Sequence, residues 1–138
     1  MRYIPRNIGS RFRDALESFP AVLLTGPRQS GKTTFLKEEF GKEYPIRYLD
    51  EPRTQLFASE DPISFLESNP PPIILDEIQY LPQLLPYIKR RIDDNRTPGQ
   101  WILTGSQQFQ LMQKVTESLA GRIAILTLLP FSLFEVLQ

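Results

Sequence analysis

Two glycines, a lysine and a threonine near the start of the chain have the spacing of a phosphate-binding loop. Gly26, Gly31, Lys32 and Thr33 satisfy the pattern G-x-x-x-x-G-K-[ST] within the segment AVLLTGPRQSGKTT. Glycine allows the main chain to approach a ligand more closely than a Cβ would permit, so N–H groups from about residue 29 to residue 33 can point at phosphate oxygens. The helix expected after the loop adds the positive end of its dipole. We therefore expect the loop to bind a nucleoside triphosphate.

Two side chains of this loop have different expected ligands, phosphate and metal. Lys32 supplies a point charge for the β- and γ-phosphates, and the Thr33 hydroxyl is placed to ligate Mg²⁺. Arg28 is expected to face a partner or solvent. The alternative is a glycine-rich turn that carries an exposed lysine. The expected nucleotide-binding residues are Gly26, Gln29, Ser30, Gly31, Lys32, Thr33 and Thr34.

An aspartate and a glutamate follow a second apolar run, in the segment PIILDEIQ. Ligands of parallel sheets bind at the carboxyl ends of the strands, so this pair is expected at the same edge as the phosphate loop. Asp76 would hold Mg²⁺ through its water shell, and Glu77 would orient and polarise a water for in-line attack on the γ-phosphate. The alternative is that both residues only cap the next turn.

Two more polar positions extend the expected site. Ser106, or Thr104 as the second choice, could sense the γ-phosphate or hold the water, unless this segment is only a turn that needs Gly105. Arg122 begins the last apolar run, and an arginine from a neighbouring subunit can meet transition-state charge on the γ-phosphate. A surface ion pair is the alternative for Arg122. The expected catalytic residues are Lys32, Glu77, Ser106 and Arg122.

The elements that would position these residues alternate along the chain. Apolar runs predict strands at 21–25, 46–50, 73–76, 101–106 and 122–129. Helical spacing of apolar residues predicts helices over 8–19, around 35–40, over 62–68, over 81–92 and over 108–120. Asp61 and Pro62 supply an N-cap and a first-turn proline for the third of these helices. The pattern predicts an α/β fold with a parallel sheet, right-handed crossovers and helices on both faces.

The composition limits the available chemistry. The chain has 138 residues, which fits one domain. It contains no Cys and no His, which excludes disulfides, thiolate nucleophiles, imidazole bases and the usual zinc ligands. Any bound metal must therefore be held by oxygen atoms, for which Mg²⁺ is the natural candidate.

The charge and hydropathy patterns bear on partners and location. Lys plus Arg and Asp plus Glu both total 16, so no overall basic field indicates nucleic acid as a primary partner. Arginines at 2, 6, 11 and 13 precede the first acidic residue, and we expect a solvated helix face there, with a local phosphate or lipid contact as the alternative. The start lacks the apolar core of a secretory signal, and no stretch approaches about 18 apolar residues, so we expect a soluble cytoplasmic protein without membrane contact.

The last ten residues, LPFSLFEVLQ, resemble the opening of another helix whose apolar side chains need a covering surface. We expect residues 1–138 to be the N-terminal ATP-binding domain of a longer protein. The alternative is a short terminal helix that docks on the sheet.

Four segments together resemble a known family. LLTGPRQSGKTT, PIILDEIQYLP, WILTGSQQF and LAGRIAILTLLPFSLFE are similar, in this order, to the AAA-type P-loop ATPase domain of a bacterial and archaeal family in which a C-terminal domain of uncharacterised function follows. The resemblance covers nearly the whole chain. It implies a three-layer P-loop NTPase fold with a five-stranded sheet of order 5-1-4-3-2, in which the strand ending at Ser106 lies between the phosphate-loop strand and the Asp76 strand.

The resemblance also implies roles for individual residues. Lys32 and Thr33 match the Walker A pair, Asp76 and Glu77 match the Walker B pair, and Ser106 matches the first sensor. Arg122 falls close to the position of the arginine finger. The chain departs from an ordinary AAA module because no helical lid with a second sensor arginine follows the last strand.

The leading hypothesis is therefore ATP binding with Mg²⁺-dependent hydrolysis, used as a conformational motor or switch for an attached or separate partner, with a homo-oligomer as a further option. Two alternatives stay open: a P-loop small-molecule kinase, and a nucleotide-gated interaction module with marginal hydrolysis. DNA binding is a weaker alternative. Ile8 and Phe12 are candidates for contact with the base of the nucleotide.

Overall fold

A five-stranded parallel sheet organises the chain. The computed structural model describes residues 8–27 and 31–129. The strands are β1 (Ala21–Thr25), β2 (Ile46–Tyr48), β3 (Ile73–Asp76), β4 (Trp101–Gly105) and β5 (Ile123–Thr127). Their order is β2-β3-β4-β1-β5, and every adjacent pair is parallel. This is the predicted order read from the opposite edge, so the α/β fold class and the topology are confirmed.

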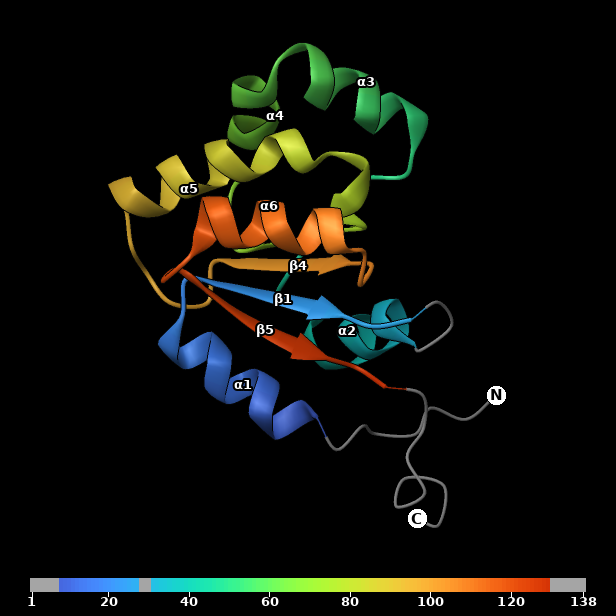
Figure 1. Cartoon of the computed structure of the whole chain (residues 1–138), viewed down its shortest axis with the longest axis vertical. Helices are drawn as coiled ribbons and strands as arrows, with labels where there is room; N and C mark the ends of the chain where they lie inside the picture. The colour runs from blue at the N-terminus through green and yellow to red at the C-terminus, as the bar shows by residue number, and fades with distance from the viewer. Residues whose placement is uncertain (1–7, 28–30, 130–138) are drawn as a thin grey trace.

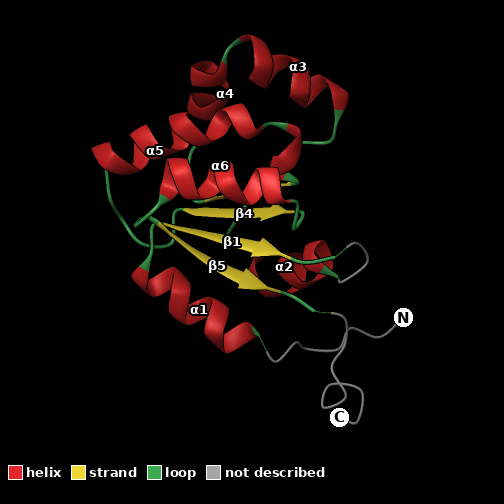
Figure 2. Ribbon diagram, in the orientation of Figure 1, coloured by secondary structure: helices red, strands yellow, loops and turns green. Residues whose placement is uncertain are grey.

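Helices cover both faces of the sheet and give three layers (Figure 1). Helices α1 (Gly9–Ser18) and α2 (Lys32–Phe40) lie on one face. The other face is covered by α3 (Pro52–Glu60), α4 (Pro62–Ser68), α5 (Leu85–Asp94) and α6 (Phe109–Leu119). Figure 2 shows that loops and turns, rather than further strands, join these layers at the two ends of the sheet.

Alternation along the central strands creates two separate apolar cores. On β1, Val22 and Leu24 pack with α1 and α2, whereas Ala21 and Leu23 point toward the layer of α3 to α6. Successive side chains of a strand point to opposite faces, so a run that is apolar at every position serves both cores. All five residues of β1 and of β4 are buried, because these two strands lie inside the sheet with helices on both faces.

The edge strands differ from the prediction that all strands are covered on both faces. The residues of β2 and of β5 are all half-buried or exposed. The reason is position: each edge strand has a neighbour on one side only and lies at the margin of the helical layers.

Two helical segments also differ from the sequence prediction. Helix α3 was not predicted, although Glu51 caps it by accepting hydrogen bonds from the N–H groups of Arg53 and Thr54. The helix predicted over 81–92 begins only at Leu85, after two short 3₁₀ turns at Ile78–Tyr80 and Pro82–Leu84. Pro86 explains the later start, because it has no N–H to donate to the turn before it.

The N-cap predicted at Asp61 is confirmed. Its carboxylate accepts hydrogen bonds from the N–H and the hydroxyl of Ser64, 3.1 and 2.7 Å long. Pro62 occupies the first turn of α4, as expected.

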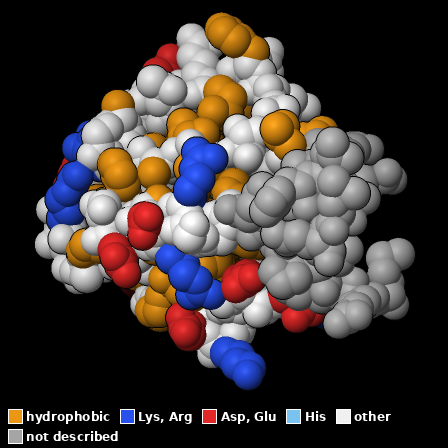
Figure 3. Space-filling view, turned by 90° about the horizontal axis from the view of Figure 1, so that it is seen from below, with side chains coloured by type: hydrophobic (Ala, Val, Ile, Leu, Met, Phe, Trp, Pro, Cys, Tyr) orange, Lys and Arg blue, Asp and Glu red, His pale blue; other side chains and the backbone are white. Residues whose placement is uncertain are grey.

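The face covered by α1 carries charges of both signs, interspersed with apolar side chains (Figure 3). Arg13 on α1 forms an ion pair with Glu39 on α2, with 2.9 Å between Nη2 and Oε2. This contact agrees with the solvated helix face expected for the arginines at 11 and 13; those at 2 and 6 lie outside the described residues. In the described ranges, no helix combines the length and the apolar character needed to cross a bilayer.

Candidate functional site

A cavity of about 720 Å³ opens at the carboxyl ends of β1, β3 and β4. This is the edge of a parallel sheet at which ligands bind, and the volume suits a ligand the size of a nucleotide. The phosphate loop and the start of α2 form one wall of the cavity, and the segments that follow β3 and β4 form the others. Its lining residues include Gly26, Gly31, Lys32, Thr33, Thr34, Glu77 and Ser106, seven of the predicted site residues.

The phosphate loop passes directly from β1 into α2. Gly31, with φ +89° and ψ +23°, precedes the first helical residue, Lys32. An L side chain rarely adopts this backbone conformation, so the loop needs glycine at this position. Gln29 and Ser30, predicted to bind nucleotide, and Arg28 lie outside the described residues.

The Lys32 ammonium lies against its own loop. Only 9% of the residue is exposed, and Nζ donates to the carbonyl oxygens of Gly26 and Pro27, at 2.9 and 3.3 Å. An ammonium has three protons, so these two contacts leave one donor for an anionic ligand in the cavity. The structure thus contradicts the alternative of a turn with an exposed lysine.

Asp76, the other predicted metal ligand, is buried behind Thr33 and does not itself line the cavity. Asp76 Oδ1 accepts hydrogen bonds from Thr33 Oγ1 at 3.2 Å and from Thr104 Oγ1 at 2.9 Å. The pKa of the Asp76 carboxyl is raised above its usual value. Burial is the main cause and the negative charge of Glu77 adds to it, whereas the hydrogen bond from Thr104 acts in the opposite direction. A buried carboxylate with a hydroxyl at its side and a second acid next to it is chemically suited to a hard cation.

The donor set fits Mg²⁺ rather than a metal enclosed by protein. No group of three or more acidic side chains converges as a metal site in the part of the chain that the structure describes. Mg²⁺ usually keeps several waters and uses one or two protein ligands together with phosphates. Thr33 and Asp76 supply two oxygen groups of that kind.

Glu77 has an unusual backbone conformation, with φ +67° and ψ +58°. No other non-glycine residue among those described has a positive φ. Its N–H donates to Thr104 Oγ1 at 2.8 Å, and its carboxylate accepts a hydrogen bond from Gln79 Nε2. A left-handed glutamate costs on the order of 1 kcal/mol and persists only where neighbouring contacts enforce it.

The two candidates at the end of β4 have different surroundings. Thr104 is fully buried, and its hydroxyl joins the Asp76 carboxylate to the Glu77 main chain. Ser106 lines the cavity, and its buried Oγ has no hydrogen-bond partner among the described residues. Ser106 is therefore the one of the two that lines the cavity and whose hydroxyl is not already used in a hydrogen bond among the described residues.

The β3–β4 ladder stops short of this site. Paired residues run from Ile73 and Trp101 to Leu75 and Leu103, whereas β2–β3 pairing continues to Asp76 and β1–β4 pairing continues to Gly105. Beyond Leu75 and Leu103, side-chain hydrogen bonds connect β3 with β4.

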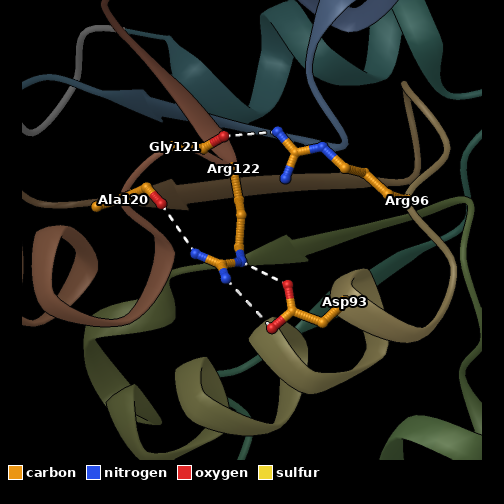
Figure 4. Close-up of polar contacts among 5 residues, drawn as sticks. All are labelled: Asp93, Arg96, Ala120, Gly121 and Arg122. Carbon is orange, nitrogen blue, oxygen red and sulfur yellow. Dashed lines mark hydrogen bonds and ion pairs between the residues drawn. The ribbon is translucent and has the colours of Figure 1, made fainter.

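Arg122 lies at the opposite end of the sheet, at the start of β5. Its guanidinium donates to both carboxylate oxygens of Asp93, at 2.7 and 3.2 Å, and to the Ala120 carbonyl oxygen at 2.9 Å (Figure 4). Arg96 donates to the Gly121 carbonyl oxygen in the same cluster, at 2.6 Å. Within its own chain Arg122 thus forms the alternative surface ion pair; a contribution to a neighbouring subunit's site stays a prediction.

The expectation that Phe12 contacts the base is wrong. Phe12 has no exposed surface, because it packs against Phe35 and Phe40 in the core beneath α1 and α2. Ile8 is 5% exposed and belongs to the same core. Neither residue lines the cavity.

Sequence reasoning missed several residues of the cavity wall. Asp50, Gln79, Tyr80, Gln107 and Gln108 line it. Gln79 and Tyr80 belong to the 3₁₀ turn after Glu77, and the other three follow strand ends. At such positions a polar residue alone does not indicate the direction of its side chain.

Comparisons with known proteins agree with this fold. A family model described as AAA domain matches residues 18–137. The uncharacterized proteins Mb2031c of Mycobacterium bovis and Rv2008c of Mycobacterium tuberculosis are each 37% identical over 124 residues, which is 89% of this chain. The chain spans 28% of the length of these two relatives.

A solved structure gives the same fold. The Walker-type ATPase PABY2304 of Pyrococcus abyssi superposes with a TM-score of 0.63 and 23% identity, over 96% of this chain and 55% of the other. The family match supports nucleotide binding at the general level. With its match over nearly the whole sequence, its parallel sheet and its phosphate loop, the chain belongs to the AAA domain family.

Proposed function

We propose that the chain binds ATP and hydrolyses it with Mg²⁺, as a conformational motor or switch. One observation carries the proposal: hydroxyls from α2 and β4 both donate to the Asp76 carboxylate, directly behind a cavity that Lys32, Thr33 and Glu77 line. Residues from three separate segments thus lie together and would provide a positive charge for phosphate, ligands for a cation and a general base.

The first step is capture of the triphosphate. The N-terminal end of α2 and the loop amides attract the phosphates, and the remaining Lys32 proton is available to their β- and γ-oxygens. Thr33 and Asp76 would hold Mg²⁺, which when bound neutralises phosphate charge. The free hydroxyl of Ser106 would donate to the γ-phosphate.

The second step is attack by water. The water oxygen forms a bond to the γ-phosphorus while the bond to the bridging oxygen of ADP breaks, giving ADP and inorganic phosphate. Glu77 accepts the water proton. Thr104 keeps the Glu77 main chain next to Asp76 while this happens.

Phosphate release from ATP without any added acceptor tests the reaction. Glu77→Gln should reduce turnover by about 10²- to 10⁴-fold while ATP stays bound, because the amide cannot accept the proton. Lys32→Ala should abolish nucleotide binding, whereas the control Lys37→Ala, at an exposed position on α2, should bind normally.

Two results would contradict hydrolysis and favour another function. Transfer of phosphate to a small molecule with negligible free phosphate would indicate a kinase. Binding and turnover that Glu77→Gln leaves nearly unchanged would indicate a nucleotide gate. Normal ATP affinity in Lys32→Ala would refute the site itself.

The wider assembly belongs to the same proposal. We propose that residues 1–138 act as one nucleotide-binding domain and transmit the state of the nucleotide to an attached C-terminal region, a protein partner or further copies of the chain. Hydrogen exchange of the whole protein in ATP and in ADP would locate the responding surface; identical exchange in both states would contradict a switch.

A further inference from the structure

Gln79 holds a position between the two strand ends that form the site. It lies in the 3₁₀ turn Ile78–Tyr80, directly after Glu77, and its side chain is half-buried at the cavity wall. The sequence alone predicted no role for it. A role beside Glu77 rests on the proposed function, in which Glu77 is the base for ATP hydrolysis.

The Gln79 amide makes two different hydrogen bonds. Its Nε2 donates to Glu77 Oε2, and its Oε1 accepts from the N–H of Ser106 at 3.3 Å. One orientation of the amide satisfies both neighbours. The reverse orientation would place the oxygen against a carboxylate and the NH₂ against an N–H group.

This contact fixes the part of Glu77 that Thr104 does not reach. Thr104 holds the main-chain N–H of Glu77, but the carboxylate lies beyond rotatable side-chain bonds. A hydrogen bond to one carboxylate oxygen restricts those rotations and leaves the other oxygen available to water. Correct placement of a base matters because a misplacement of about 1 Å can cost on the order of 100-fold in rate.

Gly105 provides the space for this arrangement. A Cβ built at Gly105 would lie 3.1 Å from Ile78 Cγ2 and 3.6 Å from Gln79 Oε1. The absence of a side chain therefore lets the turn that carries Gln79 approach the end of β4. The close approach places the amide within reach of Ser106.

We propose that Gln79 is a positioning residue for Glu77: it orients the carboxylate toward the attacking water and ties it to the main chain of Ser106. The base is thereby linked to the end of β4 that carries Ser106, the proposed donor to the γ-phosphate. The amide is required because a single side chain must donate to a carboxylate and accept from an N–H group.

Two substitutions test the proposal in the whole chain. Gln79→Met keeps the length but makes neither hydrogen bond, and Gln79→Glu keeps the acceptor for Ser106 but sets a second carboxylate against Glu77. Both should lower kcat by on the order of 10- to 100-fold, while the Kd for ATP changes by no more than about threefold. The matched control is Gln83→Met, at an exposed glutamine that donates to Ser59 outside the cavity.

A double substitution shows whether Gln79 acts through Glu77. Turnover of Glu77→Gln combined with Gln79→Met should equal that of Glu77→Gln alone, because the base to be positioned is already lost. A merely structural role would instead lower Tm and reduce both backgrounds by the same factor.

Three outcomes would overturn the inference: kcat within about twofold of the wild type in either Gln79 variant, an equal further loss in the Glu77→Gln background, or the same loss in Gln83→Met. If Gln79→Met does not fold, Gln79→Glu alone decides. Absence of phosphate release in the wild type would refute the proposed hydrolysis and the Gln79 role together, whereas normal turnover in the Gln79 variants refutes only the latter.

Discussion

Thr104 Oγ1 donates to Asp76 at 2.9 Å and accepts from the Glu77 N–H at 2.8 Å, so one buried hydroxyl holds both acidic residues of the site. Thr104→Val keeps the shape but leaves a buried N–H and a buried carboxylate each without one partner. We expect the free energy of unfolding to fall by about 1–3 kcal/mol and turnover to fall with it. Urea unfolding and phosphate release would measure both. Thr104→Ser, which keeps the hydroxyl, should stay close to the wild type, and normal turnover in Thr104→Val would contradict this role.

Ser106→Ala should lower activity without lowering stability. The Ser106 hydroxyl is buried without a partner among the described residues, so its removal should leave the free energy of unfolding unchanged or raise it by up to about 1 kcal/mol. Turnover should fall, because the γ-phosphate loses a donor. Thermal unfolding without nucleotide and phosphate release would show the two effects. If the variant has the same turnover as the wild type, Ser106 has no role in the reaction.

Gly105→Ala should destabilise the fold. The new Cβ would lie 2.7 Å from Leu111 Cδ2 and 3.1 Å from Ile78 Cγ2, both in buried side chains. Overpacking of this kind costs about 1–3 kcal/mol, which should lower Tm. The matched control is Gly9→Ala at the start of α1, where the new Cβ would make only an ordinary van der Waals contact, 4.0 Å from Phe35 Cε1. Equal Tm values for the two variants would show that β4 shifts to accept the methyl group.

Asp93 should contribute a pH-dependent part of the stability. The hydrogen bonds from Arg122 lower the pKa of the Asp93 carboxyl below its usual value, and the charge of Arg122 adds to this. Because the folded state lowers this pKa, the stabilisation is complete above the unfolded value of about 3.9 and is lost as the pH falls through the folded value. The difference in unfolding free energy between wild type and Asp93→Asn should thus be constant near neutral pH and shrink below about pH 4. Asp94→Asn serves as the control at the neighbouring carboxylate, and a difference independent of pH would contradict the ion pair.

Arg122→Ala should leave the turnover of the isolated subunit unchanged, because Arg122 lies at the sheet end opposite the cavity. Turnover would be followed over a range of protein concentrations, with Arg96→Ala as the control within the same cluster. An arginine finger between subunits would instead be supported if turnover fell only at high protein concentration. Turnover should then be restored when the variant is mixed with Glu77→Gln subunits, which still carry Arg122.

The sequence brought residues together correctly where polar side chains lie at the ends of elements. Lys32 and Thr33 begin α2, Asp76 ends β3 and Glu77 follows it, and a parallel sheet places these ends at one edge. Phe12 was wrongly predicted to contact the base, because its apolar side chain is fully buried in the core and cannot reach a ligand. The contacts of Gln79, and those of Thr104 with Asp76 and Glu77, could not be predicted, because they depend on the distance between two strand ends and on the left-handed backbone of Glu77.

The early end of the β3–β4 ladder has a mechanical consequence. The ends of β1 and β4 lead into the phosphate loop and Ser106, and the end of β3 carries Asp76 and Glu77, so the candidate site lies across the point where β3 and β4 stop pairing. The contacts between these two strand ends are hydrogen bonds of the Thr104 and Gln79 side chains, because the main-chain pairing of β3 and β4 ends at Leu75 and Leu103. In the proposed function, a triphosphate bound by residues of both strand ends would hold them together, and its hydrolysis would remove that connection.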